Sequence, residues 1–376
     1  MRHLRQLYFC GNNSFINLSQ INIANISYGR DCRDNMVLLI RPARISDFKS
    51  LFNMSECTGG GFVNLPADKD PLFDKLHRSE NSFHKSQTDL KDGVYIFVIE
   101  DTATRELLGT SQIIELVGIE WPIYHYRIDN IGRYRSEYKL TMTEKSLTLC
   151  HDLTGCTEVG GLFIYANRRA LGASRLLTRS RYMFIKMHRE RFEARTIAEL
   201  RGSRSADGRS PFWDGVTARF IKMDFSEADQ LRALRGNRFL ADLTLESPIY
   251  FSSLSQSARE AIGETHSLGH AAIHLLRGEG FSYDRYIDIF DGGPTMVAAT
   301  ERIKTVASGD CYTVSAITYL TRSDNCLLAS GQFSNFRCCF GRVSMSENGI
   351  VIDPLSANLL NLSCGDSVFC APDGMK

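Results

Sequence analysis

Three residues, Arg169, Gly172 and Ser174, have the types and the spacing of an anion-binding turn. They follow a short apolar run, Leu162–Tyr165, that predicts a buried strand, and a long run of helix formers comes after them. N–H groups at a helix N-terminus point outward, and the helix dipole favours negative charge there. Small residues let a phosphate approach the backbone, and Arg169 can add a charge-assisted contact. The segment predicts a site for a phosphate-bearing ligand.

The alternative is an ordinary connection between a strand and a helix, because a bare G-x-S is a weak signal. The three glycines of a dinucleotide-binding fingerprint and the G-K-[ST] ending of a P-loop are both missing here. The segment resembles motif A of the GNAT N-acyltransferases, [RQ]-x-x-G-x-[GA], with Ser174 in place of the last small residue. This resemblance implies that the turn binds the pyrophosphate of coenzyme A.

Composition narrows the class of protein and its surroundings. The chain has 376 residues, and 44 Lys and Arg against 43 Asp and Glu leave a net charge of +1, so no nucleic-acid partner is indicated. No apolar run reaches the roughly 18 residues that a membrane span needs. The 11 cysteines include no C-x-x-C pair, which favours reduced thiols and a cytoplasmic protein.

Hydrophobic patterning predicts a chain in three parts. Residues 1–35 lack clean periodicity and are expected to be a poorly ordered extension. Strands and helices alternate over residues 36–304, which predicts one domain with a mixed sheet, of the α+β (or α/β) class. From residue 305 to 376, short strands with Gly, Asn and Ser turns predict a small β-rich C-terminal module. The predicted elements include strands at Val37–Arg41, Tyr95–Glu100, Leu107–Leu116, Thr196–Arg201 and Tyr283–Phe290 and helices at Asp68–Lys91, Ser255–Gly263 and His270–Gly278.

Several separate segments, in order, resemble one family. They are TGGGFVNLPAD (58–68), AELRG (198–202), SPFW (210–213), MDFSEAD (223–229), PIY (248–250), EGFSYDRYIDIFDGGP (279–294) and SGQFSNFR (330–337). Together they resemble the arginine N-succinyltransferases, within the GNAT-like acyl-CoA N-acyltransferase superfamily. The resemblance implies transfer of succinyl from succinyl-CoA to the α-amino group of L-arginine, the first step of an arginine catabolic pathway. It also implies no permanently bound cofactor, and a homo- or hetero-oligomer that binds only small-molecule substrates.

The resemblance places a catalytic histidine at His266 and a succinyl-CoA contact at Leu162. The chemistry agrees, because main-chain N–H groups at Leu162 and Phe163 can polarise a thioester carbonyl. An imidazole near its free pKa of about 6.5 can act as general acid or general base, and both roles stay open. His266, His270 and His274 are spaced for one helix face. A zinc site is not favoured, because no fourth ligand is evident.

Acceptor recognition is predicted from charge, at positions within the family-like segments. A guanidinium calls for a carboxylate, and substrate carboxylates call for Arg or Lys, which makes Glu199 and Arg201 the candidates. Each could equally be part of an ion pair at the end of a strand. Two alternatives for function remain: an acyltransferase acting on ornithine or another amine, and an inactive partner subunit of such an enzyme.

Overall fold

The computed structural model describes residues 37–57, 64–84, 92–119, 121–135, 140–166, 172–205, 207–225, 227–229, 231 and 247–374. The predictions for residues 1–35 and for Arg169 concern positions outside these ranges. Residues 36–376 form one compact unit. Within the described ranges, no helix is both long enough and apolar enough to cross a membrane.

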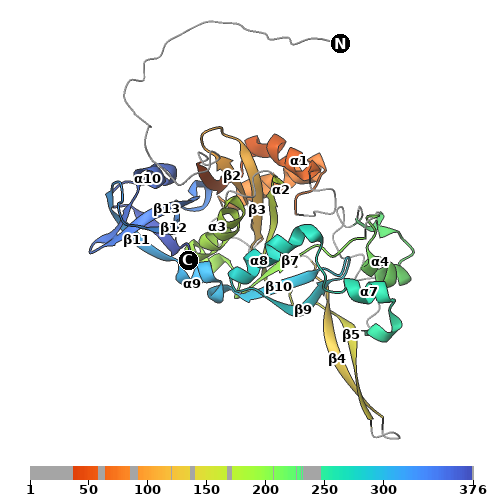
Figure 1. Ribbon diagram of the computed structural model, residues 1–376. Coiled ribbons are helices and arrows are strands. Elements are labelled where there is room, and N and C mark those ends of the chain that lie inside the picture. The colour runs from red at the N-terminus through yellow and green to blue at the C-terminus, as the bar shows by residue number, and fades with distance from the viewer. Residues whose placement is uncertain are drawn as a thin grey trace, which may run out of the picture. The chain divides into compact units, whose positions relative to one another are not determined.

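The strands of the described residues join in one mixed sheet (Figure 1). Their bounds are β1 Leu38–Pro42, β2 Val94–Asp101, β3 Leu107–Ile114, β4 His125–Arg135, β5 Leu140–Cys150, β6 Thr157–Ile164, β7 Arg195–Glu199, β8 Ile249–Tyr250, β9 Ser282–Asp288, β10 Pro294–Ala299, β11 Asp310–Ile317, β12 Asp324–Ser330, β13 Arg337–Ser346, β14 Gly349–Ile352 and β15 Ser367–Pro372. The order across the sheet is β12-β15-β11-β14-β13-β1-β2-β3-β6-β7-β10-β9-β4-β5-β8. Most neighbours are antiparallel, whereas β6–β7 and β11–β14 are parallel.

Helices pack around this sheet and give a mixed α+β architecture. The helices are α1 Phe48–Glu56, α2 Lys69–Ser82, α3 Ala173–Met187, α4 Pro211–Gly215, α7 Gln256–Ala261, α8 His270–Gly278, α9 Lys304–Ser308 and α10 Pro354–Leu360. Short 3-10 turns include η6 Phe251–Ser253 and η7 Ser267–Gly269. The predicted α+β class is therefore confirmed at this level.

Helix α3 lies on the central strands and is unusually buried for a helix with so many polar residues (Figure 1). Every residue from Leu176 to Ile185 is buried. Phe184 packs edge-on against Phe97 of β2 and against Phe336, which precedes β13. Burial of aromatic rings of this size stabilises the fold by about 1.5–3 kcal/mol per side chain. The main core therefore fixes α3 against β2 and the C-terminal strands.

The predicted β-rich segment, residues 305–376, extends the same sheet. Its strand β13 pairs with β1 at Ile40 and Cys338, and β12 and β14 pair with β13. Asp373, after β15, accepts bonds from Arg175 and Arg179 of α3. These contacts join residues 305–374 to the rest of the sheet and to α3.

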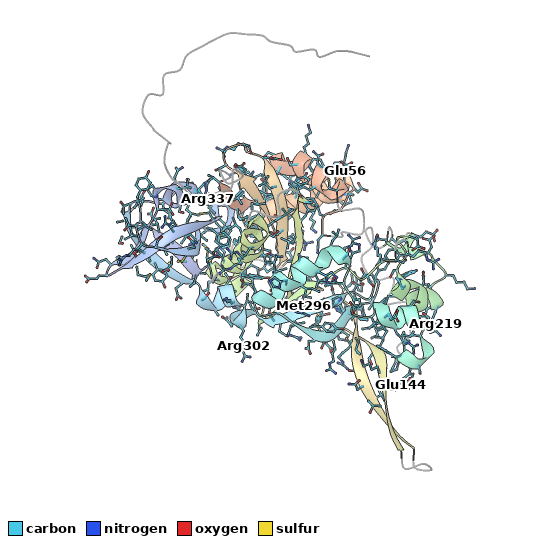
Figure 2. The ribbon with its side chains drawn as sticks, viewed as in Figure 1. Glu56, Glu144, Arg219, Met296, Arg302 and Arg337 are labelled. Carbon is cyan, nitrogen blue, oxygen red and sulfur yellow. The ribbon has the colours of Figure 1, made fainter. Side chains whose placement is uncertain are left out.

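A long two-stranded ribbon, β4–β5, extends from the end of the sheet (Figure 1). The strands pair from His125 with Cys150 to Arg135 with Leu140. Where the ribbon joins the body, Ser252 of η6 donates a hydrogen bond to Glu144 of β5, the residue marked on the ribbon in Figure 2. The sequence patterns did not predict this ribbon.

Candidate active site

A cavity of about 210 Å³ opens where β6 and β7 separate. These parallel strands pair only at Thr157 with Thr196 and Glu158 with Ile197 among the described residues. Beyond these pairs, residues 159–163 of β6 and 198–201 at the end of β7 line the cavity. The crevice at the carboxyl ends of parallel strands is a common place for a ligand, because backbone groups no longer paired in the sheet face it.

A β-bulge shapes the β6 wall of this cavity. Thr110 faces Phe163 and Gln112 faces Gly160, so Gly161 and Leu162 together oppose the single residue Ser111. Gly161 has a φ of +61°, which a residue with a side chain adopts at a cost. A bulge of this kind turns nearby N–H groups out of the regular ladder. Leu162 and Phe163 both line the cavity, as the sequence analysis expects for residues that contact the acyl donor.

The predicted phosphate turn lies at the start of α3. Gly172 is the N-cap residue of α3, is exposed, and has a left-handed φ of +71°. A Cβ added at Gly172 would meet no atom within 4 Å, so the backbone here is open to an approaching ligand. Ser174 is half-buried in the first turn. Neither residue lines the cavity, and Arg169 lies outside the described part of the chain.

His266 lies on the opposite wall of the cavity, and its geometry fixes the position of its proton. Its Nδ1 accepts the N–H of Leu268 at 3.2 Å and so caps η7. The main-chain N–H of His266 donates to the carbonyl of Arg201 at 2.8 Å, which joins this turn to the end of β7. Because Nδ1 is an acceptor, the proton of the neutral ring is on Nε2. Partial burial, then the positive charges of Arg201 and Arg204, lower the pKa of His266 and favour this neutral form.

The three histidines spaced by four do not form a metal site. His266 precedes η7, whereas His270 and His274 are exposed on α8. No cluster of His, Cys, Asp and Glu within the described ranges could hold a metal ion. His270 and His274 are surface residues here.

Glu199 and Arg201, the predicted acceptor-binding residues, also line the cavity. Glu199 Oε1 lies 2.7 Å from Nε2 of His125, a buried residue of β4. Burial alone lowers the pKa of His125, but the hydrogen bond and charge of Glu199, with the charge of Asp288, raise it overall. The pair keeps a carboxylate at the cavity wall, where it can attract a cationic acceptor.

A second carboxyl group, Glu158 of β6, lies behind this wall. Burial, and next the negative charge of Glu199, raise the pKa of Glu158 to about 7. Its Oε1 accepts a bond from Asn64 at 3.3 Å, and Asn64 lines the cavity. Lys75 donates to the carbonyl of Asn64 at 2.8 Å, and burial lowers the pKa of its ammonium to about 8. Ionisable groups around the cavity therefore change charge near neutral pH.

The Glu158→Gln variant is expected to be more stable than the natural chain at high pH. The folded-state pKa of Glu158, about 7, lies above its unfolded value near 4.5, so ionisation opposes folding. The penalty begins as the pH rises above the unfolded pKa and is complete above the folded pKa. The gain from Gln is expected to reach about 2–3 kcal/mol at pH 8. Urea unfolding at pH 5, 6, 7 and 8 measures it. A gain that is constant across this range contradicts the assignment.

Two further cavity residues, Thr178 and Arg181 of α3, were missed in the sequence analysis. The stretch that contains them is buried. The sequence did contain a signal: Thr178 and Arg181, a hydroxyl and a cationic side chain, lie three residues apart in a predicted helix and have apolar neighbours such as Leu177 and Met183.

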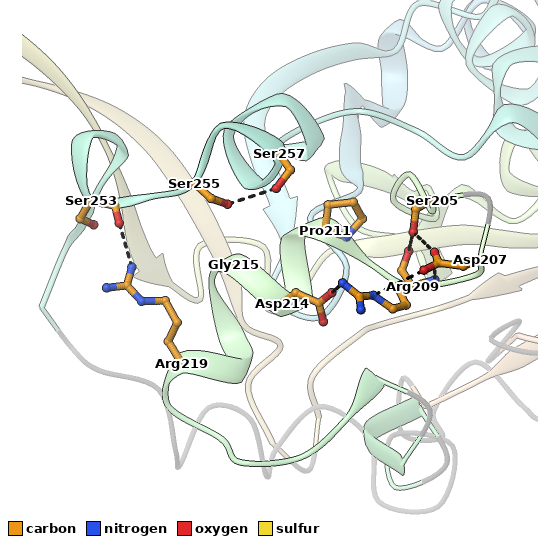
Figure 3. A pocket seen from close by; sticks show the side chains of 10 residues that line it. All are labelled: Ser205, Asp207, Arg209, Pro211, Asp214, Gly215, Arg219, Ser253, Ser255 and Ser257. Carbon is orange, nitrogen blue, oxygen red and sulfur yellow. Dashed lines mark hydrogen bonds and ion pairs between the residues drawn. The ribbon is translucent and has the colours of Figure 1, made fainter.

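A second hollow, of about 520 Å³, lies beside α4 and α7 (Figure 3). Its arginines already have partners: Arg209 faces Asp214 at 3.2 Å, and Arg219 donates to the carbonyl of Ser253 at 3.2 Å. Ser255, also in the lining, caps α7. None of the residues predicted to act on a substrate lies here, so the cavity between β6 and β7 is the candidate site.

Comparisons with known proteins show the family of this chain. The family model described as "Arginine N-succinyltransferase beta subunit" matches residues 38–305, and that of its C-terminal domain matches residues 311–372. A relative from Pseudomonas aeruginosa, named arginine N-succinyltransferase subunit beta, is 34% identical over 89% of this chain and 98% of its own length. An arginine N-succinyltransferase from Escherichia coli O139:H28 is 33% identical over 88% of this chain and 96% of its own length.

A solved structure is also similar. That of the arginine/ornithine succinyltransferase subunit AI from Pseudomonas aeruginosa superposes with a TM-score of 0.82 and 29% identity. It covers 91% of this chain and 100% of its own. The fold and the site thus define an acyltransferase. The chain belongs to the arginine N-succinyltransferase beta subunit family, which confirms the resemblance found in the sequence.

Proposed function

We propose that this chain transfers succinyl from succinyl-CoA to the α-amino group of L-arginine, giving N2-succinylarginine and coenzyme A. The observation that carries the proposal is the cavity between β6 and β7. Five residues predicted from three separate segments meet there: Leu162, Phe163, Glu199, Arg201 and His266. Family membership supplies the substrates, because the similar proteins are named for arginine and succinyl transfer.

The acyl donor lies along β6 in this proposal. Arg169, Gly172 and Ser174 hold the phosphates at the start of α3, and the acyl end enters the cavity. The N–H groups at the Leu162 bulge donate to the thioester oxygen, where negative charge develops as the amine attacks. Succinyl-CoA is a co-substrate, and no cofactor is bound permanently.

His266 donates a hydrogen bond to the leaving sulfur. Attack of the amine forms the C–N bond, and collapse of the tetrahedral intermediate breaks the C–S bond and leaves negative charge on sulfur, which the proton lost by the amine then neutralises to give the thiol. The Nε2–H of His266 is directed by the cap at Nδ1 and can stabilise that charge. The neutral ring needs no positive charge for this role, in agreement with the lowered pKa of His266.

The acceptor lies at the β7 wall. Glu199, which is held by His125, forms an ion pair with a positively charged group of the substrate arginine, and Arg201 forms an ion pair with the substrate's carboxylate. The diverging parallel pair β6–β7, with α3 between the two strands in the chain, supports a GNAT-like fold for residues 36–304, with 305–376 as a β-rich module. We propose a cytoplasmic enzyme that works as a homo- or hetero-oligomer.

A thiol-release assay tests this function. Purified protein is given succinyl-CoA with arginine, beside ornithine as acceptor and acetyl-CoA as donor. Turnover that is fastest with succinyl-CoA and arginine supports the proposal. Faster turnover with ornithine would identify ornithine, rather than arginine, as the acceptor. No thiol release with any pair of substrates favours an inactive partner subunit.

A further inference from the structure

A buried guanidinium faces the cavity without a carboxylate to neutralise it. Arg181 of α3 is 3% exposed and lines the cavity. Its Nε donates to the carbonyl of Thr178 at 3.3 Å, and Nη1 donates to the carbonyl of Gly160 at 3.2 Å. Nη2 has no hydrogen-bond partner in the part of the chain that the structure describes. A buried cation that has only carbonyl partners is costly unless a ligand supplies negative charge.

A second buried arginine of α3 and a half-buried arginine of β1 show how this chain treats such a group elsewhere. Arg179, 3% exposed on the same helix, lies 3.1 Å from Glu279 and 3.3 Å from Asp373. Arg41 of β1 pairs with Asp47 and Glu100. Both have two carboxylates. Arg181 has none within ion-pair distance among the described residues. Burial lowers its pKa, and the charges of Tyr182 and Glu279 offset this only in part.

A second buried polar group points to a ligand at the same place. Thr178, 1% exposed, also lines the cavity, and its Oγ1 has no hydrogen-bond partner among the residues that the structure describes. Thr178 and Arg181 are three residues apart, so they share a face of α3. A hydroxyl and a guanidinium that converge on one cavity suit an oxyanion with two oxygens.

The position along the site identifies the oxyanion. Helix α3 runs back along β6, since Arg181 bonds to Gly160 near the start of β6. Arg181 is nine residues, or roughly 13 Å, along the helix from the predicted phosphate turn at Gly172. Leu162, which contacts the thioester in the proposed function, lies between the turn and Gly160. The order phosphate, thioester, guanidinium follows the order of groups in succinyl-CoA, whose free carboxylate lies beyond the thioester.

We infer that Arg181 and Thr178 bind the terminal carboxylate of the acyl group and so select a dicarboxylic acyl-CoA. This rests on the proposed function for the direction of the donor. Gly160 supports the arrangement, because a Cβ there would come 2.6 Å from Nδ2 of Asn64 and crowd the same end of the cavity.

Binding measurements test the inference apart from catalysis. Calorimetry with the full chain compares succinyl-CoA with butyryl-CoA, which has the same acyl carbon count but no carboxylate. The natural chain is expected to bind succinyl-CoA at least about 100-fold more tightly. In Arg181→Met this preference is expected to fall to within a few-fold, and in Thr178→Val to fall about tenfold. Arg175→Met, on the same helix but paired with Asp373, is the control and is expected to keep the preference.

Three results overturn the inference. In the first, Arg181→Met keeps the binding preference for succinyl-CoA. In the second, it weakens the binding of succinyl-CoA and butyryl-CoA equally. In the third, it lowers turnover with arginine but not with agmatine, an acceptor without the α-carboxylate. The last result assigns Arg181 to the acceptor. If Arg181→Met does not fold, Arg181→Lys and Thr178→Val carry the comparison. If the protein shows no turnover but prefers succinyl-CoA over butyryl-CoA, and loses this preference in Arg181→Met, this inference is upheld and the proposed function fails.

Discussion

His266→Ala is expected to lower kcat by at least two orders of magnitude with a small change in KM for succinyl-CoA. The Nε2–H of the neutral side chain donates the hydrogen bond that stabilises the leaving sulfur, and loss of one such aligned donor costs about 10²–10³-fold. Thiol release under saturating arginine measures the effect. If turnover does not depend on His266, the assigned activity stands but His266 has no role in the mechanism.

The His266→Asn variant separates chemistry from structure. Nδ1 of His266 caps η7, so Ala removes both the cap and the proton donor. Asn can accept the same N–H of Leu268, because Asn is among the best capping residues. It is expected to keep the unfolding temperature of the natural chain and still lose kcat. Recovery of kcat in His266→Asn would mean that the cap, rather than the proton, accounts for the effect.

Gly161→Ala is expected to lower kcat by about 10²-fold, because loss of one aligned donor to a developing oxyanion has an effect of this size. The residue holds a φ of +61° at the bulge, and an added Cβ would come 2.9 Å from Cγ of Gln112. The strand must shift to relieve this contact, which turns the Leu162 N–H away. Steady-state kinetics with succinyl-CoA and arginine measure the loss.

Gly155→Ala is the matched control for this variant. Gly155 also has a positive φ, +83°, but a Cβ there would meet no atom within 4 Å. It is expected to cost about 1 kcal/mol of stability through backbone strain alone and to keep kcat near that of the natural chain. Equal losses of activity in the two variants would show that general destabilisation explains both.

Elements with strong apolar periodicity were predictable from the sequence. Helix α8 has the predicted bounds, His270–Gly278, and the strand predicted at Val37–Arg41 is β1, shifted by one residue. The helix predicted at Asp68–Lys91 ends at Ser82. Strand β6 begins at Thr157, five residues before the predicted Leu162, because Thr157 and Glu158 are polar. Their burial comes from pairing with β3 and β7, which local hydrophobicity does not indicate.

Long-range pairing explains what the sequence could not predict. On the β4–β5 ribbon, charged residues such as Arg127 alternate with apolar ones such as Tyr126, whose packing partners on α4 and α7 are distant in the sequence. At the site, the resemblance supplied residues from three segments, and the fold brought five of them to one cavity. Thr178 and Arg181 were missed, because their role depends on which face α3 turns to β6.

The pairing of β1 with β13 has a consequence for how the chain is made. Ile40 meets its partner Cys338 only after about 300 further residues have been added. At roughly 5–20 residues per second, synthesis takes about 15–60 s to supply that partner. Meanwhile one edge of an apolar strand, LLIRP, is open to pairing with other nascent chains. The yield of folded protein in a cell is therefore expected to depend on translation rate and on chaperones that cover this edge.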